Sequence, residues 1–271
     1  MRINTNVAAM NTYGRLTSAN ASKASSLAKL SSGLRINKAG DDAAGLAISE
    51  KMKGQIGGMN QAKRNAQDGV SLIQTAEGAL NETHSMLGRM RDLAVQAHNG
   101  TLTKDDQDQI TKEFTQLKNE ITRVASDTEF NTLKLFSGNA ATTATTFTFQ
   151  IGANDNQVIS VGIGGMNATA LGVASLAVTA TNAMSVIDKA ISTVSTQRSE
   201  LGSVQNRLEH TINNLTSASE NLSDANSRIR DVDMAEEMMS FTKSNILSQA
   251  ATTMLAQANS MPNSVLSLLQ G

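Results

Sequence analysis

The side chains with the clearest capacity for chemistry are three histidines, His84, His98 and His210, which lie far apart in the sequence. Histidine binds a metal when a second ligand stands at helical spacing, as in H-E-x-x-H, and no such motif accompanies any of the three. The chain has no cysteine, which excludes thiolate zinc sites, disulfides and cysteine catalysis. We therefore expect solvated histidines on helix surfaces and no metal or cofactor.

A group of aspartates resembles a calcium-binding loop only loosely. Asp105, Asp106 and Asp108 stand close together, but an EF-hand loop counted from Asp105 needs glycine and glutamate where this chain has Ile110 and Gln116. Acidic residues in the first turn of a helix interact favourably with the helix dipole. The sequence therefore predicts a helix start here rather than a metal site.

The remaining chemical patterns and the charge balance exclude several function classes. The glycine-rich stretch 162–165 lacks the following Lys-Ser or Lys-Thr pair of a phosphate loop, and no nucleophile–base constellation is evident. The chain holds 23 basic and 24 acidic residues, which argues against a broad nucleic-acid surface. No apolar stretch approaches the roughly 18 residues of a membrane span. We predict that the protein is not an enzyme and binds neither nucleic acid nor membrane.

Long helices are the elements that must position these residues. Apolar residues recur at alternating spacings of three and four in runs over 73–97, 110–124 and 187–232, which is the coiled-coil period. Thr103 and Asp106 form a candidate capping pair before the second run. The third run spans about 46 residues, or roughly 70 Å of helix. Helices of this length are typical of rods and bundles.

The middle of the chain has a different pattern. Residues 137–182 contain one charged residue, Asp155, and are rich in Thr, Ala, Gly and Asn. Two alternating apolar stretches flank the turn sequence GANDN, which predicts a β-hairpin at about 146–163. The predicted fold is mainly α, with long antiparallel helices in a coiled-coil-like rod or bundle and a small β-hairpin region.

The two ends of the chain share an unusual character. Residues 1–40 carry six basic and no acidic residues, and residues 244–271 carry no charge, yet both are helically periodic. Such thin segments bury too little apolar area to offset the entropy of ordering them, so we expect them to be disordered in the monomer and to fold when subunits stack. Pro262 is expected to kink or restart the last helix. The apolar residues assigned to self-assembly are Ile3, Val7, Met10, Leu27, Leu30, Leu34, Leu247, Ala251, Met254, Ala258, Val265 and Leu268.

Several long motifs resemble one known family. The start MRINTNVAAMNTYGRL, the stretch LSSGLRINKAGDDAAGLAISEKM at 30–52 and almost all of residues 228–270 are similar to bacterial flagellins. The resemblance covers nearly the whole chain except about 139–146 and 164–182. Because the chain passes from the hairpin to the third helix without a large insertion, it resembles the short, two-domain type that lacks the outer variable domains.

The resemblance implies a domain organisation. Residues 1–33 and 235–271 would form an inner terminal helical domain, the filament core, and residues 34–44 would form a connector. Residues 45–234 would form an outer helical domain that carries the hairpin.

The resemblance also implies function, location and partners. The chain would be a structural subunit that self-assembles into the extracellular flagellar filament for motility, polymerising at the distal tip as a helical homopolymer. It would be secreted unfolded by type III export without a cleaved signal peptide, and its start indeed lacks an apolar h-region. Implied partners are an export chaperone, the filament cap, hook-junction proteins and a Toll-like innate immune receptor of hosts. The receptor positions that match are Arg89, Leu93 and Glu113.

Three alternatives remain open at this point. A hook–filament junction protein would share the helical termini but occur in few copies. A cytoplasmic coiled-coil scaffold would explain the heptads but not the paired ends. A displayed enzyme would need an inserted domain, for which residues 164–182 leave no room.

Overall fold

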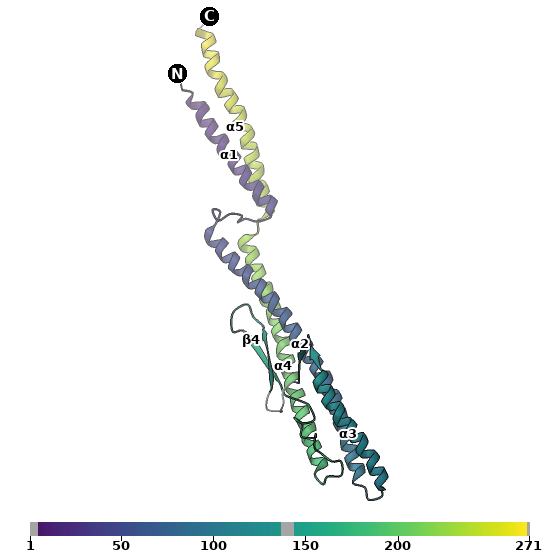
Figure 1. The fold of residues 1–271 in the computed structure, drawn as a ribbon. Coiled ribbons are helices and arrows are strands. Elements are labelled where there is room, and N and C mark those ends of the chain that lie inside the picture. Colours follow the sequence, from purple (N-terminus) through teal and green to yellow (C-terminus); the bar gives the residue numbers. More distant parts are fainter. Residues whose placement is uncertain (1–4, 137–143, 270–271) are drawn as a thin grey trace. The chain divides into compact units, whose positions relative to one another are not determined.

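The computed structural model describes residues 5–136 and 144–269, with side chains as far as Met261, and they are mainly helical (Figure 1). The predicted fold class is confirmed. The chain divides into two compact units, one formed by Gln55–Glu220 and the other by Met1–Gly54 with Asn221–Gly271. In chain order the elements are α1 (Val7–Ser32), α2 (Ala43–Ala97), α3 (Lys104–Asp127), β1 (Glu129–Phe130), β2 (Leu133–Lys134), β3 (Thr145–Gln150), β4 (Val158–Ile163), α4 (Ala183–Arg230) and α5 (Met234–Leu269).

The core of the Gln55–Glu220 unit is built from the predicted heptad residues. Every position of the first run is buried in α2, including Ile73, Leu80 and Leu87, which have no exposed surface. Phe114 of α3 and Leu201 of α4 belong to the same cluster of buried side chains. Coiled-coil spacing therefore marks the face along which these helices pack.

Helix α2 begins well before its apolar run becomes visible in the sequence. It starts at Ala43, where the carboxylate of Asp42 accepts the N–H of Gly45 at 2.8 Å and so satisfies a free donor of the first turn. Residues 43–72 are rich in Gly, Lys and Gln, so the helical period of their apolar residues is weak. Cap chemistry, rather than periodicity, identifies this helix start.

Helix α3 begins with the predicted capping pair. Thr103 Oγ1 accepts the N–H of Asp106, and the Asp106 carboxylate accepts the N–H of Thr103, so the two residues form a reciprocal capping box. The Thr103 hydroxyl also donates to the Asp106 carboxylate at 2.6 Å, and these bonds hold the pKa of Asp106 below its ordinary value. The aspartates at this position are thus helix-start residues.

The predicted hairpin is formed by β3 and β4, which pair antiparallel with Phe147 opposite Val161. It is fixed against helices on both sides. A Cβ at Gly58 of α2 would lie 2.8 Å from that of Ala153, so only glycine permits this approach. On α4, Gln197 accepts the N–H of Gly164 and donates to the carbonyl of Gly162, each at 3.1 Å. A second, shorter hairpin of β1 and β2 was not predicted.

In the other unit, α1 and α5 run antiparallel and lie side by side (Figure 1). Gly33 caps the carboxy-terminal end of α1, and its φ of 71° is the left-handed conformation that glycine adopts without strain. Leu34 then pairs with Asp231 at the junction between α4 and α5. Helix α5 is continuous past Pro262, so the last helix does not restart there.

Candidate interaction surface

The α1–α5 pair encloses only small side chains completely along its seam, while its Leu16, Leu30, Phe241 and Leu255 side chains are half-buried. Among the described side chains of these two helices, the fully buried ones are Ser26, Ser244 and Ala258. None of them contributes a large apolar group. Apolar burial stabilises by about 25 cal/mol per Å², so this seam gains little from the hydrophobic effect.

Polar contacts cross the seam along its length. The side chain of Lys23 donates to Asn245 at 2.8 Å and also lies 6.0 Å from the ring centre of Phe241. Lys29 and Glu237 form an ion pair at 3.7 Å. Two further hydrogen bonds, each 2.8 Å long, join Asn6 to the carbonyl of Ala258 and Ser248 to Asn20. These contacts fix the register of the pair, but partly exposed polar contacts contribute little net stability.

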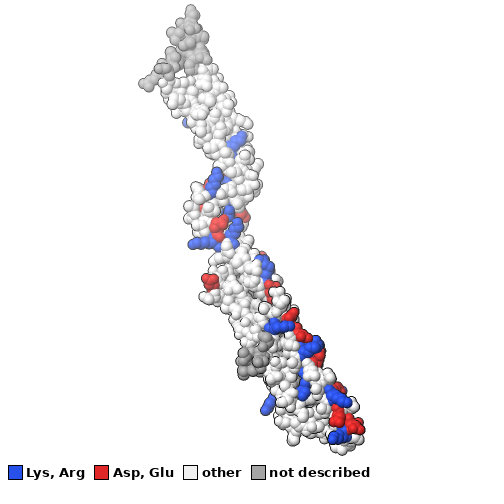
Figure 2. All heavy atoms as spheres, viewed as in Figure 1, with Lys and Arg blue, Asp and Glu red and all other residues white. Residues whose placement is uncertain are grey.

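Most of the large apolar side chains of the pair are mainly exposed to solvent. On the face that Figure 2 shows, α1 and α5 form a surface with few charged residues. Eleven large apolar residues of the two helices are each between 49% and 68% exposed. They are Val7, Met10, Tyr13 and Leu27 on α1, and Met234, Met238, Met239, Ile246, Leu247, Met254 and Met261 on α5. We call these eleven residues the outward apolar face. Exposed apolar surface of this extent marks an interaction site.

Part of this face is hollowed into an open groove of about 510 Å³ on α5. Its lining is mostly apolar, and the aliphatic stem of a lysine adds to it. The lining residues are Met238, Met239, Thr242, Lys243, Ile246 and Leu247. A groove of this shape on a helix surface fits the apolar side chains of another helix.

The residues predicted for self-assembly differ in how far they are exposed. Val7, Met10, Leu27, Leu247 and Met254 lie on the outward apolar face. Leu30, Leu34 and Ala251 are half-buried, and Ala258 is buried. Ile3 lies outside the described residues, as do the side chains of Val265 and Leu268. Residues three and four apart lie on one side of a helix, so these members of α5 share a side whose positions differ in exposure, and their role in self-assembly stays a prediction.

The sequence prediction also missed several residues of the outward apolar face. Tyr13, Met234, Met238, Met239 and Ile246 are exposed there but were not assigned to self-assembly. Met239 and Ile246 are seven residues apart, two helical turns, and this repeat beside that of Leu247 and Met254 would have identified them.

The three residues matched to a host receptor do not form one surface. Arg89 Nε of α2 and Glu113 Oε1 of α3 form an ion pair at 2.8 Å, with side chains 53% and 45% exposed. The hydrogen bond from Arg89 to Glu113 raises the pKa of Arg89. Leu93, in contrast, is 1% exposed, because it lies on the heptad face one turn along from Arg89. Arg89 and Glu113 therefore share an exposed surface, and the buried Leu93 does not belong to it.

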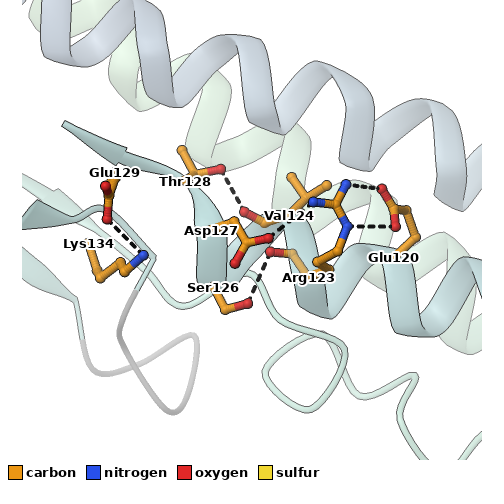
Figure 3. Close-up of polar contacts among 8 residues, drawn as sticks. All are labelled: Glu120, Arg123, Val124, Ser126, Asp127, Thr128, Glu129 and Lys134. Atoms are coloured by element: carbon orange, nitrogen blue, oxygen red, sulfur yellow. Dashed lines mark hydrogen bonds and ion pairs between the residues drawn. The ribbon is translucent and has the colours of Figure 1, made fainter. Parts of the chain in front are cut away.

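A cluster of charged side chains lies at the end of α3 and on the short hairpin that follows (Figure 3). Arg123 donates to both carboxylate oxygens of Glu120 and to Asp127, while Lys134 and Glu129 pair at 2.8 Å across β1 and β2. The bonds from Arg123 lower the pKa of Glu120. Each of these two cations is paired with carboxylates of its own helix or hairpin, so the Arg123 contacts support the end of α3 and the Lys134–Glu129 pair supports the short hairpin.

The described part of the chain shows no metal-binding cluster and no helix able to cross a membrane. No three histidine, aspartate or glutamate side chains within it are placed to hold a metal ion. None of its helices combines enough length with enough apolar character for a membrane span. His98 and His210 are exposed as predicted, whereas His84 is half-buried.

Comparisons with known proteins agree with this architecture of helical ends. Residues 3–141 match the bacterial flagellin N-terminal helical region, and residues 184–269 match the bacterial flagellin C-terminal helical region. Flagellin of Bacillus subtilis is 54% identical, and the flagellar filament 33 kDa core protein of Treponema phagedenis is 46% identical, each over the full length of both chains. The structure of a putative flagellar hook-associated protein from Vibrio parahaemolyticus covers 70% of this chain with a TM-score of 0.57. At 14% identity, it shows a shared fold alone.

These matches define a class of helical structural proteins whose amino- and carboxy-terminal regions are characteristic. The chain belongs to the bacterial flagellin family.

Proposed function

We propose that this chain is a structural subunit of the bacterial flagellar filament and that copies of it join through the outward apolar face of α1 and α5. One observation carries the proposal. Eleven large apolar side chains of the terminal pair are at least 49% exposed, whereas the described side chains that the pair buries are Ser26, Ser244 and Ala258. Other copies of the same chain would remove this surface from water.

Family membership supports the choice of partner. The relative from Treponema phagedenis is named a filament core protein, and its similarity extends over both terminal helices. Contacts between unlike surfaces of identical subunits give a ring when the rotation between subunits closes and an open helical filament when it does not, and a filament core protein requires the open form. The proposed product is therefore an extracellular homopolymer rather than a closed oligomer, and its role is mechanical rather than enzymatic.

Export and capping extend the same proposal. Before assembly the outward apolar face is uncovered, so a free subunit in the cell needs a chaperone on α5. We propose secretion of the unfolded chain by type III export, followed by addition at the distal tip under a cap. Hook-junction proteins with the same kind of terminal helices would form the first layer.

The self-assembly surface is tested by replacing Ile246 and Leu247 together with Asn. Full burial of one such side chain is worth about 1.5–3 kcal/mol, so the double variant should raise the critical concentration for assembly by at least about a hundredfold. Monomer is mixed with sheared filament ends, and polymer is measured by sedimentation and electron microscopy.

The matched control is Val95→Asn, because Val95 is 49% exposed on α2 in the other unit. It should leave assembly within a few-fold of the unmodified chain. Circular dichroism should show equal helicity in all three proteins. Normal filaments from the Ile246→Asn, Leu247→Asn protein would refute the proposed surface.

We also propose that the exposed Arg89–Glu113 pair contributes to recognition by a Toll-like innate immune receptor. An exposed ion pair adds only about 0–1 kcal/mol to folding, so it can be removed without unfolding the chain. Such a pair can contribute more when a partner excludes water from it. The Arg89→Ala, Glu113→Ala monomer should therefore activate receptor-expressing reporter cells at least about tenfold less than the unmodified monomer.

The control for this test is the Arg91→Ala, Asp188→Ala protein. Arg91 and Asp188 form an ion pair of similar exposure at 2.7 Å between α2 and α4. This protein should keep full signalling. If removal of the Arg89–Glu113 pair leaves signalling unchanged, the pair has no role in recognition.

A further inference from the structure

The methionines of the chain are divided sharply by exposure. Those of the Gln55–Glu220 unit are buried or half-buried, with Met59, Met90 and Met166 between 0% and 8% exposed. All described methionines with at least 49% exposure lie on α1 or α5. These are Met10, Met234, Met238, Met239, Met254 and Met261, at 49% to 68% exposure.

We infer that these six methionines are a modification site at which oxidation to methionine sulfoxide switches off subunit assembly. The inference rests on the proposed function, because it names a regulation of the outward apolar face. Susceptibility of methionine to oxidants follows exposure of the sulfur. In the free subunit the six thioethers are accessible, whereas the buried methionines of the other unit are shielded by packed side chains.

The chemistry requires a two-electron oxidant such as hydrogen peroxide. The sulfur lone pair attacks one peroxide oxygen, the O–O bond breaks, and the products are one sulfoxide and one water. The thioether is oxidised and the peroxide is reduced. Methionine sulfoxide reductases reverse the change.

The consequence follows from the position of these sulfurs. Met238 and Met239 line the open groove on α5, and Met254 lies on the outward apolar face farther along the same helix. A sulfoxide oxygen accepts hydrogen bonds from water and loses them when another subunit covers it. Each modified position therefore opposes assembly, while the fold of the subunit, whose seam uses none of these six residues, is kept.

The test begins with soluble monomer treated with graded hydrogen peroxide. Peptide mass spectrometry should find sulfoxide at the six exposed positions before Met59, Met90 or Met166. Seeded assembly, measured by sedimentation, should then need at least about a tenfold higher monomer concentration, the equivalent of losing one buried methionine. Treatment with methionine sulfoxide reductases should restore assembly, and preformed filaments should be oxidised more slowly at the same positions.

A protein with leucine at all six positions provides the matched variant, since Met-to-Leu exchanges conserve volume. It should assemble equally well before and after peroxide treatment. A Met59→Leu, Met184→Leu protein should remain as sensitive as the unmodified chain. Circular dichroism verifies that oxidation does not unfold the helices.

The outcomes separate the two ideas. If untreated monomer does not grow from seeds, the proposed function fails. If untreated monomer grows, and monomer with sulfoxide confirmed at Met238, Met239 and Met254 grows equally well, the oxidation switch is refuted and the filament proposal stands. Oxidation of the buried and exposed methionines at equal rates would also refute it.

Discussion

At the scale of single residues, the turn between β1 and β2 contains a residue in an unfavourable conformation. Asn131 and Thr132 have φ values of 50° and 65°, as a two-residue hairpin turn requires. Asparagine tolerates this region, but a β-branched residue is a true outlier there. We predict that Thr132→Gly stabilises the Gln55–Glu220 unit by about 1 kcal/mol. This is the strain released, about 1–3 kcal/mol, less the greater flexibility of glycine when unfolded.

The measurement is the urea midpoint of unfolding followed by circular dichroism. Thr132→Ala serves as the control, because alanine keeps a Cβ at positive φ and also loses the contact of the threonine hydroxyl with the Asn131 carbonyl. Thr132→Ala should be no more stable than the unmodified protein. Equal midpoints for the glycine and alanine proteins would show that Thr132 is not strained.

Single residues were predictable from the sequence where local chemistry decides their role. The Thr103–Asp106 capping box follows from residue types three positions apart, and the structure confirms it. Leu93 was misassigned because its distance from Arg89 along the helix suggests a shared face, whereas its heptad position places it in the core. The packing partner, which the sequence does not name, decides between these two interpretations.

At the scale of elements, Gln197 connects α4 to the end of β4. It occupies a heptad position where apolar residues are expected, and it is 8% exposed. Its side chain pairs with both the N–H of Gly164 and the carbonyl of Gly162. We predict that Gln197→Leu destabilises the unit by about 2 kcal/mol, because the buried backbone groups lose their partners.

Amide hydrogen exchange of Gly164 and the urea midpoint measure this effect. The Gly164 N–H should exchange at least about tenfold faster in the Gln197→Leu protein. Gln67→Leu is the matched control, since Gln67 is exposed on α2 and the same exchange there should be nearly neutral. An unchanged or raised midpoint for Gln197→Leu would mean that apolar packing outweighs the two hydrogen bonds.

The elements themselves were predictable in proportion to the strength of their periodicity. The heptads of 73–97 and 187–232 predicted long packed helices, because a helix with one continuous apolar stripe buries that stripe against its neighbours. The terminal helices are different. Ala258 is 7% exposed and Met254 is 64% exposed, although they are four residues apart and lie on the same side of α5. Apolar period alone does not decide which positions on a side are covered within one chain when the larger side chains belong to an interface between molecules.

At the scale of the whole molecule, the unequal burial of apolar side chains indicates unequal stability. The Gln55–Glu220 unit has a core of fully buried Ile, Leu, Met and Phe residues. In the α1–α5 pair the buried described side chains are serine and alanine, and large apolar ones such as Leu16 and Phe241 are only half-buried. Helices that bury little apolar surface are marginal in water, since most helix stability in proteins comes from tertiary packing. The terminal pair should therefore open often in the free subunit and close firmly only between neighbours.

Amide hydrogen exchange on monomer and filament tests this difference directly. In the monomer, we predict slow exchange for the buried heptad positions of α2 and α4 and exchange at least about a hundredfold faster throughout residues 7–32 and 234–261. In the filament, both terminal segments should become as protected as the core. Because ordering the ends opposes each addition, growth should also show a lag that seeds remove.

A truncated chain that lacks residues 244–271 separates folding from assembly. The Gln55–Glu220 unit uses no residue from that segment, so its cooperative unfolding and its slow-exchanging amides should remain unchanged. The truncated protein should nevertheless fail to extend seeds, because it lacks the part of α5 that carries Ile246, Leu247 and Met254. If the intact monomer already protects both ends as strongly as its core, or if the truncated chain forms normal filaments, ordering of the terminal pair does not drive assembly.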